Sequence, residues 1–397
     1  MKVFLFTNAF PSGGGETFLS PECEIVAEIK DIELTIIPLF IENGMRELSP
    51  SITIDLSLST YLERHHERKI WPLILSVPNI IAGLFTNPIN SFRAIRDVVG
   101  FAHHGNLIAK WAQKNLAGDE FLYAYWFERI TYGLALYKQR TKRDQCLVSR
   151  VHRYDLYEEK RPHGFIPYRA FTLRYLEKIF SISADGESYL NEKYPWFNSV
   201  ELSRLGVPKR DLNEIKESEE IQTVSCSSVI KVKRVELIFE ALQSVARSTD
   251  MKIHWIHFGD GPLLAELKGR VVEAPSNLKI TLKGQVANPQ VLEFYEENEV
   301  HLFLNLSDSE GVPVSIMEAI SCGIPVIARD VGGNAEIVND KTGVLLSPNP
   351  GLEEITNEIG SLLKAQPSRE KIQHFHEEHY DSERNFQAFY QRLLTIQ

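Results

Sequence analysis

The sequence has few cysteines and no long apolar run. Its four cysteines, at positions 23, 146, 226 and 322, are too scattered for a zinc knuckle and too few for a disulfide framework. We expect them to fill small spaces in the core. No stretch reaches the roughly 20 apolar residues that a membrane span needs. The opening ten residues carry one lysine among mostly apolar residues, which predicts a first strand rather than a signal peptide, so we expect a cytoplasmic protein.

An excess of positive charge is also missing. The chain holds 43 basic and 53 acidic side chains, for a net charge of -10. Residues 1–200 hold 23 of each, which leaves 20 basic and 30 acidic side chains for residues 201–397. Nucleic-acid binding requires clustered Lys and Arg, so no nucleic-acid partner is expected. The neutral first half is the better candidate for approaching an anionic surface.

Two common nucleotide-site motifs are absent. No Asp-x-Asp occurs, and "DSE" at 308–310 is the nearest sequence to it. The run of three glycines at 13–15 fails the G-x-G-x-x-G spacing, because Phe18 occupies the last position. These absences disfavour a metal-bridged nucleotide site and a hydride-transfer enzyme.

The chain's 397 residues suffice for two domains, and the second half alternates strands with helices. This alternation indicates βαβ units, a parallel sheet and a ligand site beyond the carboxyl ends of the strands. Strands are expected at 221–230, 252–259, 278–284, 300–307, 324–330 and 343–348, with helices at 235–247, 261–271, 289–298 and 312–323.

The first half begins in the same way, with expected strands at 2–8, 33–40, 121–127, 146–152 and 178–184. We predict an α/β fold in two parts: a first domain at 1–205, a polar linker at 206–220 and a second domain at 221–380. The residues 381–397 are expected to form a terminal helix that packs back on the first domain.

The segment "SDSEGVPVSIMEAISCGIPVIARDVGGNAEIV" at 307–338 combines acidic residues with a helix start. Pro313 suits the first helical position, and Gly323 suits the C-terminal cap. Backbone amides near 311–315 favour a phosphate, whereas the carboxylates of Glu310 and Glu318 are suited to sugar hydroxyls. Together they describe a nucleotide-sugar site. The simpler interpretation makes Glu310 a loop acid, Glu318 a solvated helix residue and Glu336 an acid favoured by a helix dipole.

The same segment resembles the signature of the retaining glycosyltransferases of family 4, which have the GT-B fold. "FGDGPLLAEL" at 258–267 and "VIKVKRVELIFEAL" at 229–242 resemble that family's strand-turn-helix and its basic loop. "GGGETF" at 13–18 and "SRVHRYDLY" at 149–157 resemble its glycine loop and its histidine-bearing strand end. The closest likeness is to bacterial transferases that build exopolysaccharide, capsule or lipopolysaccharide.

The resemblance implies two Rossmann-like domains that face each other across a cleft, and a retaining hexosyl transfer that uses no metal and no cofactor. Glu310 would bind hydroxyls of the donor sugar, Glu318 the ribose and Lys233 the diphosphate. The family's arginine has no match, because Ser227 and Ser228 stand in its place; Lys231 or Arg234 are candidate substitutes.

His152 matches the family's histidine near the donor sugar. The expected catalytic residues are thus His152, Glu310 and Lys233, with no protein nucleophile. The donor site is expected to comprise Gly14, Gly15, Lys233, Arg234, Gly259, Gly284, Gln285, Glu310, Gly311, Val312, Pro313 and Glu318. Glu16 and Asp155 are the expected acceptor-binding residues.

The expected partners are a UDP- or GDP-linked sugar and a glycan or lipid-linked acceptor. The apolar stretch at 70–88 is either core or a patch on the inner face of the membrane. A nucleotide-sugar epimerase or phosphorylase on the same fold stays open as an alternative. So does a catalytically inactive donor-binding partner subunit, motivated by the missing arginine.

Overall fold

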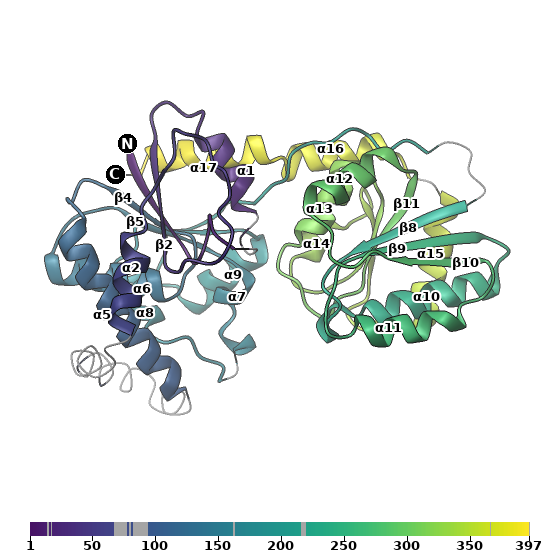
Figure 1. The fold of residues 1–397 in the computed structure, drawn as a ribbon, viewed down its shortest axis with the longest axis horizontal. Helices are drawn as coiled ribbons and strands as arrows, with labels where there is room; N and C mark the ends of the chain where they lie inside the picture. The colour runs from purple at the N-terminus through teal and green to yellow at the C-terminus, as the bar shows by residue number, and fades with distance from the viewer. Residues whose placement is uncertain are drawn as a thin grey trace. The chain divides into compact units, whose positions relative to one another are not determined.

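The computed structural model divides into two compact units (Figure 1). The first comprises Met1–Arg204 and Phe386–Gln397, and the second comprises Leu205–Asn385. The described residues are 1–13, 16, 18–66, 78, 81, 94–161, 163–215, 220–365 and 367–396. Most of the apolar stretch at 70–88, and with it the question of its role, lies outside them. Among the described residues, no helix has the length and apolar character to cross a membrane.

The first unit is built on a seven-stranded parallel sheet with the order β3-β2-β1-β4-β5-β6-β7. The apolar strand interiors are buried because helices cover both faces of such a sheet. The order reverses between β1 and β4, so the loops after these two strands diverge at one edge. The strands are β1 (Lys2–Thr7), β2 (Glu33–Pro38), β3 (Thr53–Ile54), β4 (Phe121–Ala124), β5 (Leu147–Val151), β6 (Lys178–Ser181) and β7 (Val200–Leu202).

The helices of this unit include two long elements that pack closely, α5 (Ile95–Asn115) and α6 (Arg129–Thr141). Their shared face belongs to an apolar core that includes Ile108, Trp111 and Leu134. The other helical elements described here are α1 (Leu19–Val26), α2 (Ser57–His66), α7 (Arg153–Leu156), η1 (Glu158–Lys160), α8 (Arg169–Leu173) and α9 (Ala184–Lys193).

The terminal helix α17 (Ser382–Leu394) contributes its apolar side to the first unit's core. Beneath it, Arg150 of β5 and Glu22 of α1 form an ion pair of 3.0 Å in which both side chains are completely buried. Tyr390 of α17 donates a hydrogen bond of 3.2 Å to the same Glu22 carboxylate. The Arg150 guanidinium lies 4.2 Å from the centre of the Phe389 ring. A buried charge pair therefore ties the end of the chain to the first sheet.

The second unit has a six-stranded parallel sheet with the order β10-β9-β8-β11-β12-β13. Here the order reverses between β8 and β11, which makes the carboxyl ends of these two strands the expected ligand-binding edge. The strands are β8 (Glu220–Cys226), β9 (Lys252–Phe258), β10 (Leu278–Leu282), β11 (Val300–Asn305), β12 (Val326–Arg329) and β13 (Gly343–Leu346).

Helix α10 (Val235–Ser248) has the amphipathic pattern from which the sequence predicted it. Val235, Ile238, Phe239 and Leu242 recur at helical spacing and are all buried. The other helical elements are η2 (Lys231–Lys233), α11 (Leu264–Arg270), η3 (Val271–Glu273), α12 (Asn288–Glu297), α13 (Val314–Ser321), α14 (Asn334–Ile337), α15 (Leu352–Ala365) and α16 (Arg369–His379); α10 itself spans Val235–Ser248.

The polar segment expected to be a linker, 206–220, has ordered contacts in the second unit over its described part. The backbone N–H of Val207 donates to Tyr380 at 3.0 Å, and the completely buried Asn213 donates its amide to the carbonyls of Tyr295 and Asn298. Its residues 216–219 lie outside the described part.

Candidate functional site

The two residues at the centre of the site follow the two strands where the second sheet reverses its order. Lys233 ends the short turn after β8, and Glu310 lies five residues beyond the end of β11. The Lys233 ammonium is 2.7 Å from Oε1 and 2.8 Å from Oε2 of Glu310. The Glu310 side chain is 7% exposed and that of Lys233 is 25% exposed. Asn305, the last residue of β11, also donates its amide to Oε1 at 3.2 Å.

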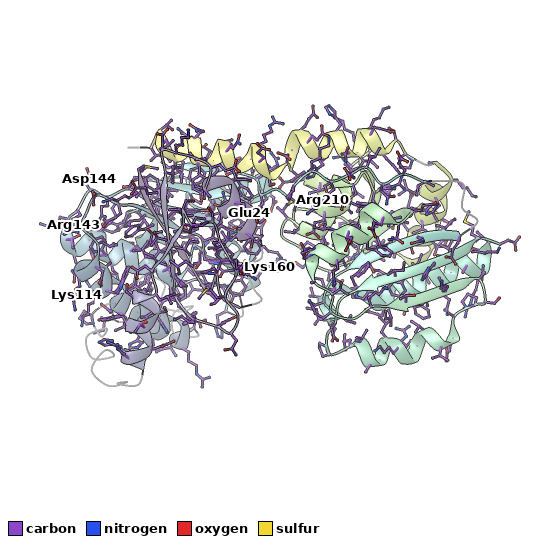
Figure 2. All side chains as sticks on the ribbon, turned by 45° about the horizontal axis from the view of Figure 1, so that its top comes forward. Glu24, Lys114, Arg143, Asp144, Lys160 and Arg210 are labelled. Atoms are coloured by element: carbon purple, nitrogen blue, oxygen red, sulfur yellow. The ribbon has the colours of Figure 1, made fainter. Side chains whose placement is uncertain are left out.

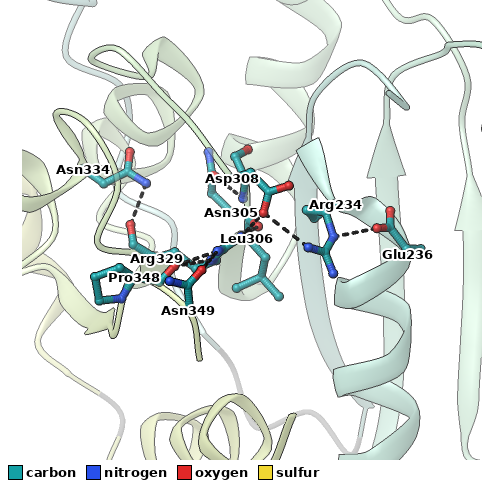
Figure 3. Close-up of polar contacts among 10 residues, drawn as sticks. Arg234, Glu236, Asn305, Leu306, Asp308, Arg329, Asn334, Pro348 and Asn349 are labelled. Carbon is teal, nitrogen blue, oxygen red and sulfur yellow. Dashed lines mark hydrogen bonds and ion pairs between the residues drawn. The ribbon is translucent and has the colours of Figure 1, made fainter. Parts of the chain in front are cut away.

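A second set of charges supports the loop that carries Glu310 (Figure 3). Arg234 donates to Asp308 at 3.3 Å and to Glu236 at 2.7 Å. Arg329, at the end of β12, reaches the same Asp308 carboxylate. The backbone N–H of Asp308 donates to Val232 at 2.8 Å. Asp308 therefore joins the loops that follow β8 and β11 to the end of β12.

Arg234 has an unusual backbone conformation for a residue with a side chain. Its φ of 48° and ψ of 41° lie in the left-handed region. That region costs a non-glycine residue free energy, and such costs are concentrated at functional sites. This arginine follows directly after Lys233, so the strained position belongs to the same basic turn.

The glycine pair after β12 is required by close packing against the Glu310 loop. A Cβ atom on Gly332 would lie 2.0 Å from the Glu310 carbonyl oxygen, and the φ of Gly332 is +57°. The backbone N–H of Gly333 donates to the Gly311 carbonyl at 2.7 Å. The two turns thus hold each other in place through their backbones.

Helix α13 starts at Val314, two residues after the start of the expected range 312–323. Pro313 is its N-cap with an extended backbone, and the first helical residue is Val314. Gly311, Val312 and Pro313 form the turn that leads from Glu310 into this helix. At the other end, the helix stops at Ser321 and Gly323 follows with a φ of +72°.

Glu318 projects from α13 into a buried environment. Its side chain is 6% exposed, and Oε1 accepts a hydrogen bond of 2.7 Å from the amide of Asn288 on α12. Burial raises the pKa of Glu318 to about 7, whereas the Asn288 amide and the charge of Arg210 act in the opposite direction. Arg210 belongs to the segment of the second unit that precedes β8 (Figure 2). The interpretation of Glu318 as a solvated helix residue is therefore wrong.

The turns that carry Gly259 and Gly284, both expected in the donor site, are joined backbone to backbone. Gly259 donates its N–H to the carbonyl of Gly284 at 2.8 Å, next to the exposed Gln285. A Cβ atom on Gly259 would lie 1.9 Å from the carbonyl oxygen of Ser227. Of the two serines that stand in the place of the family's arginine, Ser227 is thus packed tightly against the turn after β9, and Ser228 is exposed.

His152 directly follows β5 of the first unit and is 6% exposed. Its ring lies 4.4 Å from the Trp126 ring and 4.7 Å from the Tyr125 ring, measured between centroids. Within the described part of the chain, neither ring nitrogen has a hydrogen-bond partner. Burial and the charge of Arg150 lower the pKa of His152 well below its usual value, so the ring is neutral at pH 7.

The two expected acceptor-binding acids are engaged by their own unit. Asp155 is completely buried and accepts backbone N–H donors from His152 and Phe127, each at 2.6 Å. Burial raises its pKa to about 7. Glu16 accepts from the backbone N–H groups of Ala9 and Phe10 at 2.8 and 2.7 Å and from the indole of Trp126.

The acceptor role of Glu16 and Asp155 stays a prediction. Gly14 and Gly15, expected to contact the donor, lie outside the described residues. Among the described residues, no group of three or more His, Cys, Asp or Glu side chains is arranged to hold a metal ion.

Four residues of the site were not anticipated: Asn288, Asn305, Asp308 and Arg329. Polar residues at the ends of otherwise apolar strands, such as Asn305 and Arg329, are a signal that sequence reasoning could have used. No comparable signal pointed to Asn288, because its contact with Glu318 depends on how two helices pack.

The part of the chain that carries Lys233, Glu310 and Glu318 is similar to known proteins. Residues 209–379 match the family model "Glycosyl transferases group 1". The chain is 29% identical over 188 residues to the sulfoquinovosyl transferase SQD2 of Arabidopsis thaliana, a match that covers 44% of this chain and 35% of that protein. It is 31% identical over 144 residues to the N-acetyl-alpha-D-glucosaminyl L-malate synthase of Bacillus anthracis, covering 34% of this chain and 36% of that one. The chain thus spans about a third of the length of these relatives. The sequence matches support a group 1 glycosyltransferase.

Solved structures resemble the whole chain. The lipopolysaccharide outer core galactosyltransferase WaaB aligns with a TM-score of 0.69 at 15% identity, covering 100% of this chain and 99% of that one. HepE of Anabaena, solved in complex with UDP, aligns with a TM-score of 0.64 at 15% identity over 100% of both chains. Together with the two parallel sheets, these likenesses confirm the predicted GT-B fold with two Rossmann-like domains.

Proposed function

We propose that this protein is a retaining, metal-independent glycosyltransferase. It transfers a hexose from a nucleotide-diphosphate sugar to a glycan or lipid-linked acceptor in the biosynthesis of a cell-surface polysaccharide. The observation that carries the proposal is the contact between Lys233 and Glu310 where the second sheet reverses its order. The match of residues 209–379 to the group 1 glycosyl transferases supports the same reaction class.

The charges at this edge suit the bond that must break. Departure of a diphosphate from an anomeric carbon builds negative charge on the phosphates and positive character on the sugar. A lysine ammonium next to the phosphates lowers the barrier because it stabilises the developing charge. The Glu310 carboxylate accepts hydrogen bonds from sugar hydroxyls and, by its contact, fixes where the ammonium lies. No protein nucleophile is assigned in this proposal.

Arg234 is the residue that we assign to the second cation of the diphosphate site. It stands in the same turn as Lys233 and is held by Glu236 and Asp308. A guanidinium binds phosphate oxygens in pairs, which the hydroxyls of Ser227 and Ser228 do not reproduce. Glu318 is assigned to the ribose, because a buried carboxylate accepts hydroxyl hydrogen bonds with little competition from water.

In the first unit, His152 is assigned to the reacting sugar. Its neutral ring has two nitrogens that can each serve one hydrogen bond, as donor or acceptor. Asp155 fixes the turn that carries His152 by accepting backbone N–H groups. Glu16 holds the indole of Trp126, whose ring lies next to that of His152. Contact of Glu16 and Asp155 with the acceptor is part of the proposal.

The donor is proposed to be a UDP- or GDP-linked sugar. One structural neighbour, HepE of Anabaena, was solved in complex with UDP-glucose, which supports a uridine nucleotide. The protein is proposed to act in the cytoplasm, at the inner face of the membrane, where lipid-linked acceptors are accessible.

A thermal-shift screen tests the donor site first. The purified protein is heated with UDP, GDP, ADP, TDP and their common sugar conjugates, each with and without a chelator. A ligand that binds only the folded state raises its melting temperature, so a shift with one nucleotide that is indifferent to chelator supports the proposal and identifies the base. Product from that donor and a glycan acceptor, with its anomeric configuration determined by NMR, then tests retention.

The missing arginine favours one second candidate, a donor-binding subunit without catalysis. Nucleotide binding without hydrolysis or transfer would support it. An epimerase or phosphorylase on the same fold is distinguished by its products, because neither one delivers the sugar to a glycan acceptor.

A further inference from the structure

The hydrogen bond between Asn288 and Glu318 joins an exposed side chain to a buried one. Asn288 is the first residue of α12 and is exposed, whereas Glu318 on α13 is 6% exposed. The amide Nδ2 donates to Oε1 at 2.7 Å. An exposed carboxamide can make its hydrogen bonds to water. Its hydrogen bond to the buried Glu318 carboxylate therefore points to a role in the proposed nucleotide site.

We propose that Asn288 is a positioning residue of the nucleotide site, which holds the Glu318 carboxylate in the orientation that accepts the ribose hydroxyls. The inference rests on the proposed function, because Glu318 is its ribose ligand. It goes further by assigning a role to a residue in a different helix and by predicting how nucleotide affinity depends on pH.

The arrangement of the two helices makes Asn288 suitable for this role. Helix α12 follows β10 and helix α13 follows β11, so both helices begin at the carboxyl edge of the parallel sheet. Asn288 lies in the first turn of α12 and Glu318 in the second turn of α13. An amide N–H group can only donate, so the oxygen that it binds must act as an acceptor. This contact therefore favours the ionised carboxylate and restricts its rotation.

The other groups that act on Glu318 keep a constant charge near neutral pH. The guanidinium of Arg210, which forms an ion pair of 3.7 Å with Glu296, stays positive. Burial raises the pKa of the Cys226 and Cys322 thiols to about 12, and that of the Tyr295 phenol well above its usual value. These three groups are neutral at pH 6 to 8, so Glu318 is the group of this set whose charge changes in that range. The variant Glu318→Gln separates its effect from that of Asp155, whose pKa burial also raises to about 7.

The direction of the pH effect follows from burial. The pKa of Glu318 is raised to about 7, so the carboxylate becomes ionised as the pH rises through neutrality. Hydrogen bonds to an ionised acceptor are stronger than those to a neutral one. Nucleotide affinity is therefore expected to increase from pH 6 to pH 8. Loss of the Asn288 amide removes an interaction that favours ionisation, and the rise in affinity moves to higher pH.

Isothermal titration calorimetry of the full chain tests the inference, with UDP-glucose and GDP-mannose as probes between pH 6 and 8.5. The diphosphate of a nucleotide sugar has both phosphates esterified and does not titrate in this range. Asn288→Ala is expected to bind about tenfold more weakly at pH 7 and to recover most of that loss at pH 8.5. Gln290→Ala removes an exposed carboxamide from the same helical turn and is expected to match the wild type.

Glu318→Gln supplies a second readout, because an amide in place of the carboxylate has no proton to gain. Its affinity is expected to be low and independent of pH. Circular dichroism and melting temperature check that each variant is folded. The inference is overturned if Asn288→Ala keeps the wild-type affinity and pH profile, or if it binds more tightly because Asn288 competes with the ribose. Absence of binding by the wild type at every pH would instead overturn the proposed function, and this inference with it.

Discussion

The contact between Lys233 and Glu310 makes a quantitative prediction about diphosphate recognition. Replacing Lys233 with Met keeps most of the apolar stem but removes the ammonium that lies 2.7 and 2.8 Å from the two Glu310 oxygens. The Glu310 side chain, which is 7% exposed in the wild type, then loses its cation and keeps the Asn305 amide at 3.2 Å. Loss of one partner from a buried carboxylate costs about 1–3 kcal/mol, so a modest loss of stability is expected.

The effect on binding should be larger and selective. A hydrogen bond between charged groups contributes about 1.5–3 kcal/mol, which corresponds to about 10- to 150-fold in affinity. This loss is expected for UDP or GDP, whichever binds, and not for the matching nucleoside, which has no phosphate. Lys268→Met, an equal change of charge at an exposed position on α11, is the matched control.

Calorimetric titration with the nucleoside diphosphate and the nucleoside separates these effects. If Lys233→Met weakened both ligands equally, the lysine would act on the architecture of the site and not on the phosphates. If it weakened neither, the assignment of Lys233 to the diphosphate would be wrong.

Three further predictions concern other parts of the molecule. His152→Ala is expected to lower turnover about 100-fold with donor affinity kept, because the sugar loses one polar partner; a normal rate in a transfer assay would remove His152 from the site. Gly332→Ala places a Cβ atom 2.0 Å from the Glu310 carbonyl oxygen at a left-handed φ. It should cost at least about 1–2 kcal/mol in stability and most of the activity, and a wild-type melting temperature and rate would contradict that. Arg150→Met leaves Glu22 buried without its cation and should destabilise the fold by about 3–5 kcal/mol in urea denaturation; combining it with Glu22→Leu should recover most of this loss, and an additive loss would refute the pairing argument.

The fold was largely predictable because each long buried strand is a short run of apolar residues that can be recognised in the sequence. The strand β11, for example, was expected at 300–307 and spans Val300–Asn305. In a parallel sheet covered on both faces, such strands are continuous apolar runs. The short edge strands β3 and β7 were not predicted, since two or three residues give no periodicity.

The sequence indicated which residues could form the candidate site, and not how they are arranged in space. Glu310 and Lys233 are 77 positions apart in the sequence, and they meet because β8 and β11 are neighbours in the sheet. Strand order is a long-range property that no local pattern contains. Side-chain pairing is equally hidden: the carboxylates of Glu16 and Asp155 accept backbone amides, and a sequence cannot distinguish such an acid from one that faces a ligand.

The buried contact between Glu22, Arg150 and Tyr390 has a consequence for the order in which the protein is synthesised and folded. The second unit is continuous from Leu205 to Asn385, so all of its residues are present before the helix α17 is completed. The first unit includes Phe386–Gln397, and its buried ion pair is closed over by aromatic residues from that helix. On the ribosome, residues 1–204 must therefore wait for Phe386–Gln397, which are made after the whole second unit. Until then Arg150 and Glu22 keep access to water, and the second unit is the one able to fold first.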